Sequence, residues 1–244
     1  MTTPSIAVFR PDDERLESAR STLDSLGAET VADPMLSINP TGATPRVDAD
    51  HTVFTSRTGV EIADDADWTP PGTISAIGDR TASHLSERGY PVAVVPETFS
   101  SDGLVGALAD RVDGVRIDVA RSDHGSPVLL DGLNDAGAYV HETVLYELCR
   151  PPEAGRSVEL AAAGALDGAL FTSSLTVEHF VATATDDDRR TAAIEGLNDA
   201  VVGAIGEPTR ETATELGIDV GVVPETATFE ALAAAVYARI SSEE

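Results

Sequence analysis

Short apolar runs alternate along the chain with longer segments in which apolar residues recur every three or four positions. The first run, residues 5–10, precedes leucines and alanines at helical spacing between positions 16 and 26, and Gly27 follows. This order predicts a strand, a helix and a glycine stop. The strands that the pattern predicts in the first half of the chain are residues 5–10, 29–38, 51–56, 74–77 and 92–95.

Helices are predicted between these strands. In the first half they run through Val60 and Ala63, over 78–88 up to Gly89, and over 101–111, while residues 39–50 and 68–72 are predicted loops. The second half begins with a strand at 115–120, a helix through Leu129, Leu130 and Leu133 that ends before Gly137, and a strand at 139–146. Short strands that alternate with helices in each half predict parallel sheets covered on both faces.

Two segments of the chain are copies of each other. Residues 76–112 and 204–240 align without a gap at an offset of 128 and match at 15 of 37 positions. Both contain Ala-Ile-Gly followed three residues later by Thr, a later Gly, and Val-Val-Pro-Glu-Thr. Weaker matches pair Phe9-Arg10 with Ala120-Arg121 and Phe54-Thr55-Ser56 with Phe171-Thr172-Ser173. The chain is therefore an internal duplication over nearly its whole length.

The charge of the chain is strongly skewed. It has 42 acidic and 16 basic residues, a net charge of −26, and all the basic residues are arginine because no lysine occurs. Such a surface repels nucleic acid and anionic membranes, so both are poor partners. Because salt screens the self-repulsion, the acidity indicates a halophilic organism. The alternative is an acidic protein of an ordinary organism, against which the missing lysine counts.

Cysteine usage and hydropathy narrow the class further. The single cysteine, Cys149, excludes an internal disulfide and a multi-cysteine metal site, and a buried structural thiol is favoured over a nucleophile. Residues 1–11 lack the basic and long apolar regions of a secretion signal, and no apolar run approaches the roughly 18 residues of a membrane span. We therefore expect a soluble, cytoplasmic protein.

The usual catalytic motifs are missing. The sequence has no dinucleotide or Walker glycine loop, no H-E-x-x-H, no C-x-x-C and no G-x-S-x-G. The five histidines lack ligand spacing, and the acidic run at 186–190 is predicted to be a solvated loop. No metal site or cofactor is expected.

Small polar residues at the carboxyl ends of predicted strands remain as candidates, because open α/β sheets bind ligands at that edge. One set is Arg10, Thr55, Ser56, Gly78 and Thr81, and the other is Arg121, Thr172, Ser173, Ser174, Gly206 and Thr209. Where a strand passes into a helix, free backbone N–H groups and a hydroxyl suit a carboxylate or phosphate. The alternative is that the hydroxyls only cap helices and the glycines only permit turns, which a duplicated fold would also repeat.

These residues carry a resemblance to a known family. The chain contains twice, in this order, Phe-Thr-Ser, Ala-Ile-Gly-x-x-Thr, a Gly and a Val-Pro, and between the two sets it has Gly-Ala-x-Val-x-x-x-x-x-Tyr at 137–146. This ordered set of motifs resembles the uroporphyrinogen-III synthase family. The resemblance implies an α/β fold of two HemD-like, flavodoxin-like parallel-sheet domains joined by a two-stranded linker. It places residues 1–37 with 149–244 in a discontinuous domain 1 and 38–148 in domain 2. The blocks at Gly78 and Gly206 would then face one cleft.

The resemblance also implies an activity. Members of the family convert linear hydroxymethylbilane to uroporphyrinogen III with inversion of ring D, without metal or organic cofactor. Tyr146 matches the family's Tyr after the Gly-Ala strand and is the candidate acid for loss of the substrate hydroxyl; the alternative is a structural tyrosine near the hinge. Arg10 and Arg121 are candidate contacts to acetate or propionate groups, with surface ion pairs as the alternative. Asp123, in the loop 122–125, fits badly beside a polyanion and puts the Arg121 contact in doubt.

Two further expectations concern the partners of the protein and its class of function. The expected partner is the substrate alone, with transient contact to the preceding enzyme of the pathway at most, and the working unit is expected to be a monomer. A function of a different class stays open: a non-catalytic sensor with two flavodoxin-like lobes that closes on a small anion without turnover.

Overall fold

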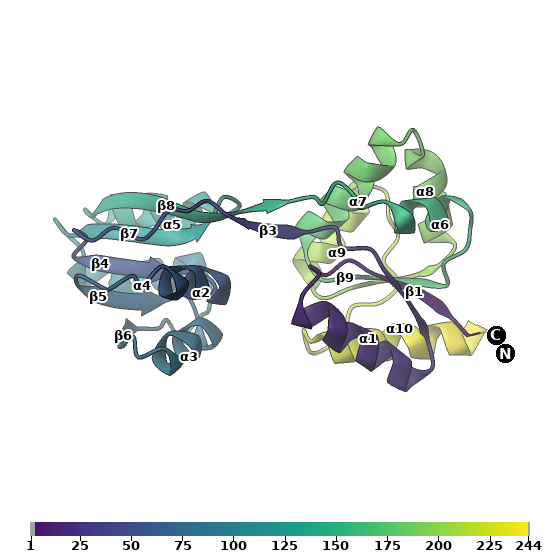
Figure 1. Cartoon of the computed structure of the whole chain (residues 1–244), viewed down its shortest axis with the longest axis horizontal. Helices are drawn as coiled ribbons and strands as arrows, with labels where there is room; N and C mark the ends of the chain where they lie inside the picture. Colours follow the sequence, from purple (N-terminus) through teal and green to yellow (C-terminus); the bar gives the residue numbers. More distant parts are fainter. Residues whose placement is uncertain (1–2, 244) are drawn as a thin grey trace. The chain divides into compact units, whose positions relative to one another are not determined.

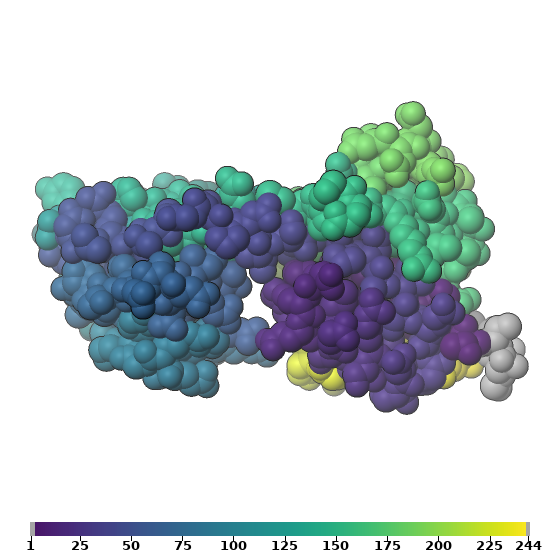
Figure 2. All heavy atoms as spheres, in the orientation of Figure 1, coloured from purple at the N-terminus to yellow at the C-terminus, as the bar shows by residue number. Residues whose placement is uncertain are grey.

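The chain folds into two units, which we describe separately in a computed structural model that covers residues 3–243. Unit 1 comprises Met1–Ser37 and Cys149–Glu244, and unit 2 is the continuous segment Ile38–Leu148 (Figure 1). Unit 1 therefore combines the first part of the sequence with the last, and Figure 2 shows its surface built from purple N-terminal atoms, green atoms of the second half of the chain and a smaller area of yellow C-terminal atoms. No helix among residues 3–243 is both long and apolar enough to cross a membrane.

Unit 1 is built on a parallel sheet of four short strands. The order is β10-β9-β1-β2, with β1 (Ser5–Val8), β2 (Glu29–Ala32), β9 (Gly168–Phe171) and β10 (Val201–Ala204). The two inner strands are almost wholly apolar and almost fully buried. This is the composition expected of parallel strands that are covered on both faces.

Helices cover both faces of this sheet. Ile6, Val8 and Leu170 pack on one side against α1 (Glu14–Leu26) and α10 (Phe229–Glu243). Ala7, Phe9 and their neighbours point to the other side. The helices of the other side are α6 (Arg156–Ala162), α7 (Ser174–Asp186), α8 (Arg190–Asn198) and α9 (Glu207–Glu215). The alternation of strand side chains thus fills two cores at once.

Unit 2 has a six-stranded sheet. The order is β3-β8-β7-β4-β5-β6, with β3 (Ser37–Pro40), β4 (His51–Phe54), β5 (Thr73–Ala76), β6 (Val92–Val94), β7 (Arg116–Ser122) and β8 (Tyr139–Cys149). The pairs from β8 to β6 are parallel. Strand β3 lies beside β8, where Ser37 Oγ donates to the Cys149 carbonyl and Thr41 N–H donates to the Leu145 carbonyl. This spacing makes β3 antiparallel to β8.

The helices of unit 2 also form two layers. One core packs α2 (Arg57–Asp65) and α3 (Asp79–Glu87) around Phe54, Trp68 and Leu145. The other packs α4 (Ser101–Leu108) and α5 (Pro127–Asp135) around Val53 and Val119, and the short 3₁₀ helix η1 (Ala109–Arg111) follows α4 directly. The predicted α/β class with parallel sheets covered on both faces is therefore confirmed.

The two units share a common core of four strands. The order β5-β4-β7-β8 in unit 2 corresponds to β10-β9-β1-β2 in unit 1, and the sequence copies at 76–112 and 204–240 start at the last residues of β5 and β10. Unit 2 adds β3 at one edge and β6 at the other. In unit 1 the segment equivalent to β6 makes only an isolated bridge from Gly203 to Val222. Duplication thus preserved strand order and changed the edges.

Three local predictions were wrong. Residues 29–38 form two strands, β2 and β3, because the chain breaks at Asp33, whose buried carboxylate accepts the Ser157 N–H at 2.7 Å and so ties this turn to α6. The first half of the sequence accordingly holds six strands and the second half four. Cys149 is half-buried at the end of β8, not sealed in a core.

Candidate functional site

The carboxyl edge of the unit 2 sheet carries the first group of predicted residues. Strand β4 ends at Phe54, and Thr55 and Ser56 lead into α2, where Ser56 is the N-cap and its Oγ accepts the Gly59 N–H at 3.0 Å. Both hydroxyl residues are half-buried. The capping role that was the alternative for Ser56 is therefore present.

Tyr146 joins Ser56 from a different strand. The Tyr146 hydroxyl donates to Ser56 Oγ at 2.9 Å, although the two residues are 90 positions apart in sequence. The tyrosine is 6% exposed and packs in the core beneath α2 with Phe54 and Leu145. Its phenol thus lies at the positive end of the α2 dipole, where a negative charge is stabilised.

The second helix start at this edge belongs to α3. Gly78 is the N-cap, in extended conformation and without a side-chain cap, and Thr81 follows in the first turn. The exposed ring of Phe99 lies against Gly78, and an added Cβ there would come within 3.1 Å of Phe99 Cγ. The first-turn amides of α3 therefore have no side-chain cap that would compete with a ligand.

Unit 1 repeats this arrangement at its own carboxyl edge. Ser173 follows Thr172 and caps α7, with its Oγ accepting the Thr176 N–H at 3.3 Å. Ser174 Oγ donates to the Pro208 carbonyl at 3.2 Å, so the starts of α7 and α9 lie together. Gly206 is the N-cap of α9 and, like Gly78, supplies no side-chain cap.

Thr81 and Thr209 share an unusual environment. They are 5% and 4% exposed, and their hydroxyls make no hydrogen bond to any residue within the described range 3–243. The only fully enclosed polar side-chain atoms without a partner in that range are Thr30 Oγ1 and Trp68 Nε1, so the two threonine hydroxyls reach the surface. A hydroxyl held in a buried side chain and open to solvent is a fixed donor for a ligand.

Arg10 follows β1 at the carboxyl edge of unit 1. Its guanidinium lies over the ring of Phe229 at 4.5 Å from the centroid, and Nη1 donates to the Arg15 carbonyl at 3.3 Å. Burial, with a contribution from Arg15, lowers the pKa of Arg10, which nevertheless stays charged. None of the carboxylates that the structure describes lies within ion-pair distance of it. An arginine without such a pair in so acidic a chain is open to an anionic ligand.

Arg121 occupies the position in β7 that is equivalent to that of Arg10 after β1, but its side chain is engaged by the chain itself and gives the expected substrate contact no support. Its side chain is buried at the end of β7, where Nε donates to Glu142 and Nη1 to the Ser126 carbonyl, both at 2.6 Å. Gly125 packs against it, and an added Cβ would come within 2.4 Å of the guanidinium. Arg121 therefore forms a structural ion pair with Glu142 and shapes the loop after β7.

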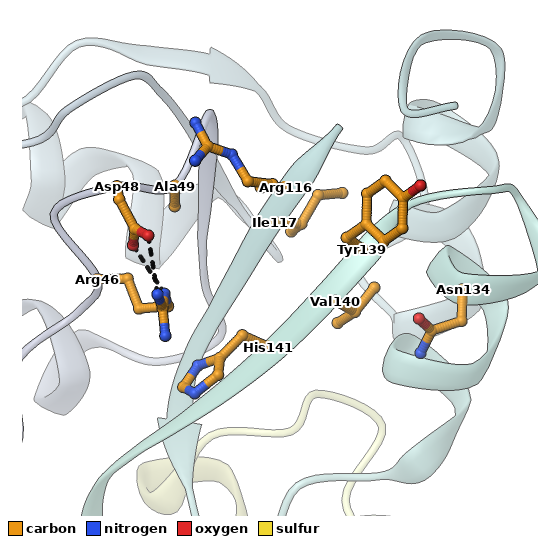
Figure 3. A pocket seen from close by; sticks show the side chains of 9 residues that line it. All are labelled: Arg46, Asp48, Ala49, Arg116, Ile117, Asn134, Tyr139, Val140 and His141. Carbon is orange, nitrogen blue, oxygen red and sulfur yellow. Dashed lines mark hydrogen bonds and ion pairs between the residues drawn. The ribbon is translucent and has the colours of Figure 1, made fainter. Parts of the chain in front are cut away.

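A pocket that the sequence did not predict lies at the opposite, amino-terminal edge of the unit 2 sheet (Figure 3). It has a volume of about 340 Å³ and is lined by Arg46, Arg116, Tyr139, His141 and neighbouring residues. Its two arginines are already paired with carboxylates, Arg46 with Asp48 and Arg116 with Asp50. No motif in the sequence marks this pocket, because the loop 41–50 that closes it has no pattern of its own.

Asp118 explains how that edge is built. Its carboxylate is fully buried and accepts the Arg46 N–H at 2.8 Å, His141 Nδ1 at 2.9 Å and the Thr143 hydroxyl at 2.8 Å. Three donors satisfy the buried carboxyl oxygens and fix the loop 41–50 to β7 and β8. No group of three or more potential metal ligands occurs among residues 3–243.

Comparison with known proteins places this arrangement among its relatives. A family model described as uroporphyrinogen-III synthase HemD matches residues 17–234. A candidate uroporphyrinogen-III synthase of Methanothermobacter thermautotrophicus is 32% identical over 248 aligned residues, which cover 95% of this chain and 96% of the relative.

Solved structures show the same fold. A mutant uroporphyrinogen III synthase from the extremely thermophilic bacterium Thermus thermophilus superimposes with a TM-score of 0.69 at 20% identity, covering 99% of this chain and 100% of that one. The uroporphyrinogen-III synthetase of Helicobacter pylori gives a TM-score of 0.62 at 13% identity, covering 99% of each chain.

The fold and the site define an α/β protein with two parallel sheets, each of which presents capped and uncapped helix starts at its carboxyl edge. The matches to sequence relatives cover nearly the whole of it. The chain belongs to the uroporphyrinogen-III synthase (HemD) family.

Proposed function

We propose that this protein is a uroporphyrinogen-III synthase that cyclises hydroxymethylbilane with inversion of ring D, releasing water. Membership of the family supports the activity. The observation that carries the proposal is the pair of buried threonines, Thr81 and Thr209, whose unpartnered hydroxyls open beside uncapped helix starts, one in each unit. The proposal includes a cytoplasmic location and a monomeric working unit, with at most transient contact to the enzyme that supplies the substrate.

The helix starts suit the carboxylates of the substrate. In the first turn of α3 the Thr81 N–H donates to the Gly78 carbonyl, and in that of α9 Pro208 has no N–H, so only the remaining first-turn N–H groups can serve a ligand. Each helix dipole favours an anion at this end. Acetate and propionate groups would accept from these amides and from the adjacent threonine hydroxyls, with Arg10 as a charged contact. One acidic residue in each first turn, Asp79 or Glu207, limits the charge that these sites tolerate, and Glu207 is paired with Arg210.

The chemistry makes small demands on the protein. Loss of the terminal hydroxyl of the substrate as water gives an azafulvene, and the substituted carbon of ring D attacks it to form a spiro intermediate. That intermediate fragments and closes with ring D inverted, and a proton leaves the ring carbon as the pyrrole regains aromaticity. Both nucleophile and electrophile belong to the substrate. The protein must hold the chain in the conformation that leads to the spiro route and supply a proton to the leaving hydroxide.

Tyr146 is the proposed proton donor. Its phenol is held by Ser56 at the start of α2, where the helix dipole and the Ser56 hydroxyl stabilise the phenolate that remains after proton transfer. The proton released at ring closure restores the phenol, so the cycle needs no external acid. The burial of Tyr146 keeps bulk water from competing for the proton.

The proposal is tested by feeding freshly made hydroxymethylbilane to the protein in molar salt and separating isomers I and III by chromatography. Isomer III above the spontaneous background is expected from the unchanged protein. Isomer I alone, at the spontaneous rate, would refute the synthase function.

The role of Tyr146 is tested in the same assay with Tyr146→Phe. Positioned acids contribute about 100-fold or more, so kcat is expected to fall by about 10- to 100-fold for this modest acid. Tyr139→Phe is the matched control, because Tyr139 lies on the same strand but is 71% exposed at the opposite edge. Near-normal turnover by Tyr146→Phe would show that the phenol is structural.

A further inference from the structure

Strand β8 loses its regular alternation just where it carries Tyr146. In the pairing with β7, Arg121 lies opposite Val144 but Ser122 lies opposite Tyr146, so one residue of β8 is unpaired. Leu145 and Tyr146 are adjacent in sequence, yet both are buried in the same core beneath α2. Adjacent residues of a regular strand point to opposite faces of a sheet. The structure therefore has a β-bulge at residues 144–146.

The bulge determines where the phenol points. One residue more or less in a strand sends every following side chain to the other face. Leu145 faces α2, so without the extra residue Tyr146 would face α4 and α5 on the far side of the sheet. With the bulge it faces α2, and its hydroxyl reaches Ser56 at 2.9 Å.

Asp123 contacts β8 at the last residue of the bulge and again two residues beyond it. Its backbone N–H donates to the Tyr146 carbonyl at 3.2 Å, and its Oδ1 accepts the Leu148 N–H at 3.0 Å. His124 Nδ1 lies 2.8 Å from the same oxygen. Burial acts to raise the pKa of Asp123, but the hydrogen bonds from His124 and Leu148 outweigh it and leave this pKa lowered. The carboxylate is thus kept ionised as an acceptor.

We propose that Asp123 is a positioning residue, which fixes the bulge in β8 and so aims the Tyr146 hydroxyl at the start of α2. This inference rests on the proposed function, in which Tyr146 is the acid. It also gives a reason for an acidic residue near a polyanionic substrate, because the carboxylate is engaged by the chain itself. The Asp123 N–H fixes the Tyr146 carbonyl, and its Oδ1 fixes the Leu148 N–H two residues further on.

The test replaces Asp123 with alanine and measures kcat, KM and the ratio of isomers III and I. Small displacements of a catalytic group cost up to about 100-fold, and we expect kcat to fall about tenfold with KM changed less than about twofold. Because spontaneous closure then competes, the fraction of isomer III should fall. Asp123→Asn keeps an acceptor oxygen and should retain most of the activity. The matched control is Asp48→Ala, which removes an ion-paired aspartate at the opposite edge of the same sheet.

A double substitution separates positioning from general destabilisation. If Asp123 acts through Tyr146, Asp123→Ala should cost nothing further in a Tyr146→Phe background, because coupled residues are not additive. Full multiplication of the two losses would overturn the proposal. Amide exchange of Leu148 by NMR gives a readout without turnover, and it should speed up in Asp123→Ala but not in Asp48→Ala.

The outcomes also separate this inference from the proposed function. Isomer III from the unchanged protein and from Asp123→Ala at equal kcat refutes the positioning role alone. Isomer I alone from the unchanged protein refutes the synthase function, and the role of Asp123 in catalysis is refuted with it.

Discussion

Replacing Ser56 with alanine tests the hydrogen bonds that join α2 to β8. Ser56 Oγ accepts both the Gly59 N–H and the Tyr146 hydroxyl, at 3.0 and 2.9 Å. Loss of an N-cap costs about 1 kcal/mol. Leaving the buried tyrosine hydroxyl without its acceptor costs roughly 1 kcal/mol more. We expect Ser56→Ala to lower the free energy of unfolding of unit 2 by about 2 kcal/mol, about a 30-fold change in the ratio of folded to unfolded protein.

The chain carries its own probe for this measurement. Trp68 is the only tryptophan in the sequence, and it packs in the unit 2 core with its ring 5.6 Å from that of Phe54. Its fluorescence during urea denaturation in molar salt therefore reports the unfolding of unit 2. The same core contains Tyr146, so the probe lies close to the perturbed bond.

The matched control is Ser100→Ala in the same unit. Ser100 caps α4 and accepts the Gly103 N–H at 3.1 Å, but its Oγ has no tyrosine partner among the described residues. It should cost only the cap, about 1 kcal/mol. In a Tyr146→Phe background the cost of Ser56→Ala should fall to the same value. Equal losses for Ser56→Ala and Ser100→Ala in the unchanged background would refute the reasoning.

Two further predictions concern charge. His51 is buried between the hydroxyls of Ser75 and Thr73, and burial, with a contribution from Arg111, lowers its pKa. The neutral His51 side chain therefore contributes its full share of the free energy of unfolding above about pH 6.5, the ordinary histidine pKa. That contribution is lost as the pH falls through the pKa of His51 in the folded protein. Urea titrations from pH 7.5 to 5 should show a smaller loss of stability in His51→Asn, and parallel curves would contradict this. Arg10→Gln should raise KM for hydroxymethylbilane about tenfold, the loss of one charge-assisted hydrogen bond, whereas Arg20→Gln on the exposed surface of α1 should leave KM unchanged; equal KM values in the two variants would remove Arg10 from the site.

Strands, helix ends and helix caps could be predicted from the sequence. Apolar runs marked the strands, Gly27 and Gly89 adopt the left-handed conformation expected after their helices, and Ser56 and Ser173 cap helices at strand ends. These features depend on residues that are a few positions apart, so the sequence pattern contains them.

Features that depend on contacts between residues far apart in the sequence could not be predicted from it. The 29–38 segment breaks because Asp33 finds a backbone partner more than 120 residues away in α6. Arg121 resembles Arg10 by position, but Glu142 and Ser126 bury it, whereas Phe229 holds Arg10 near the surface. Similarly, the bulge that brings Tyr146 to Ser56 arises from pairing between strands. Such outcomes are decided by tertiary packing.

The interruption of unit 1 by unit 2 has a consequence for synthesis on the ribosome. Strand β1 is an inner strand whose partner β9 begins at Gly168, so its apolar side chains emerge long before that neighbour exists. Unit 2 is continuous and has all of its strands except the first residue of β3 and the last of β8 within Ile38–Leu148. We expect unit 2 to fold first on the nascent chain, at a time when β1 and β2 of unit 1 still lack β9 and β10. In a chain with 42 acidic residues, charge repulsion between neighbouring nascent chains would help to keep that exposed edge from aggregating.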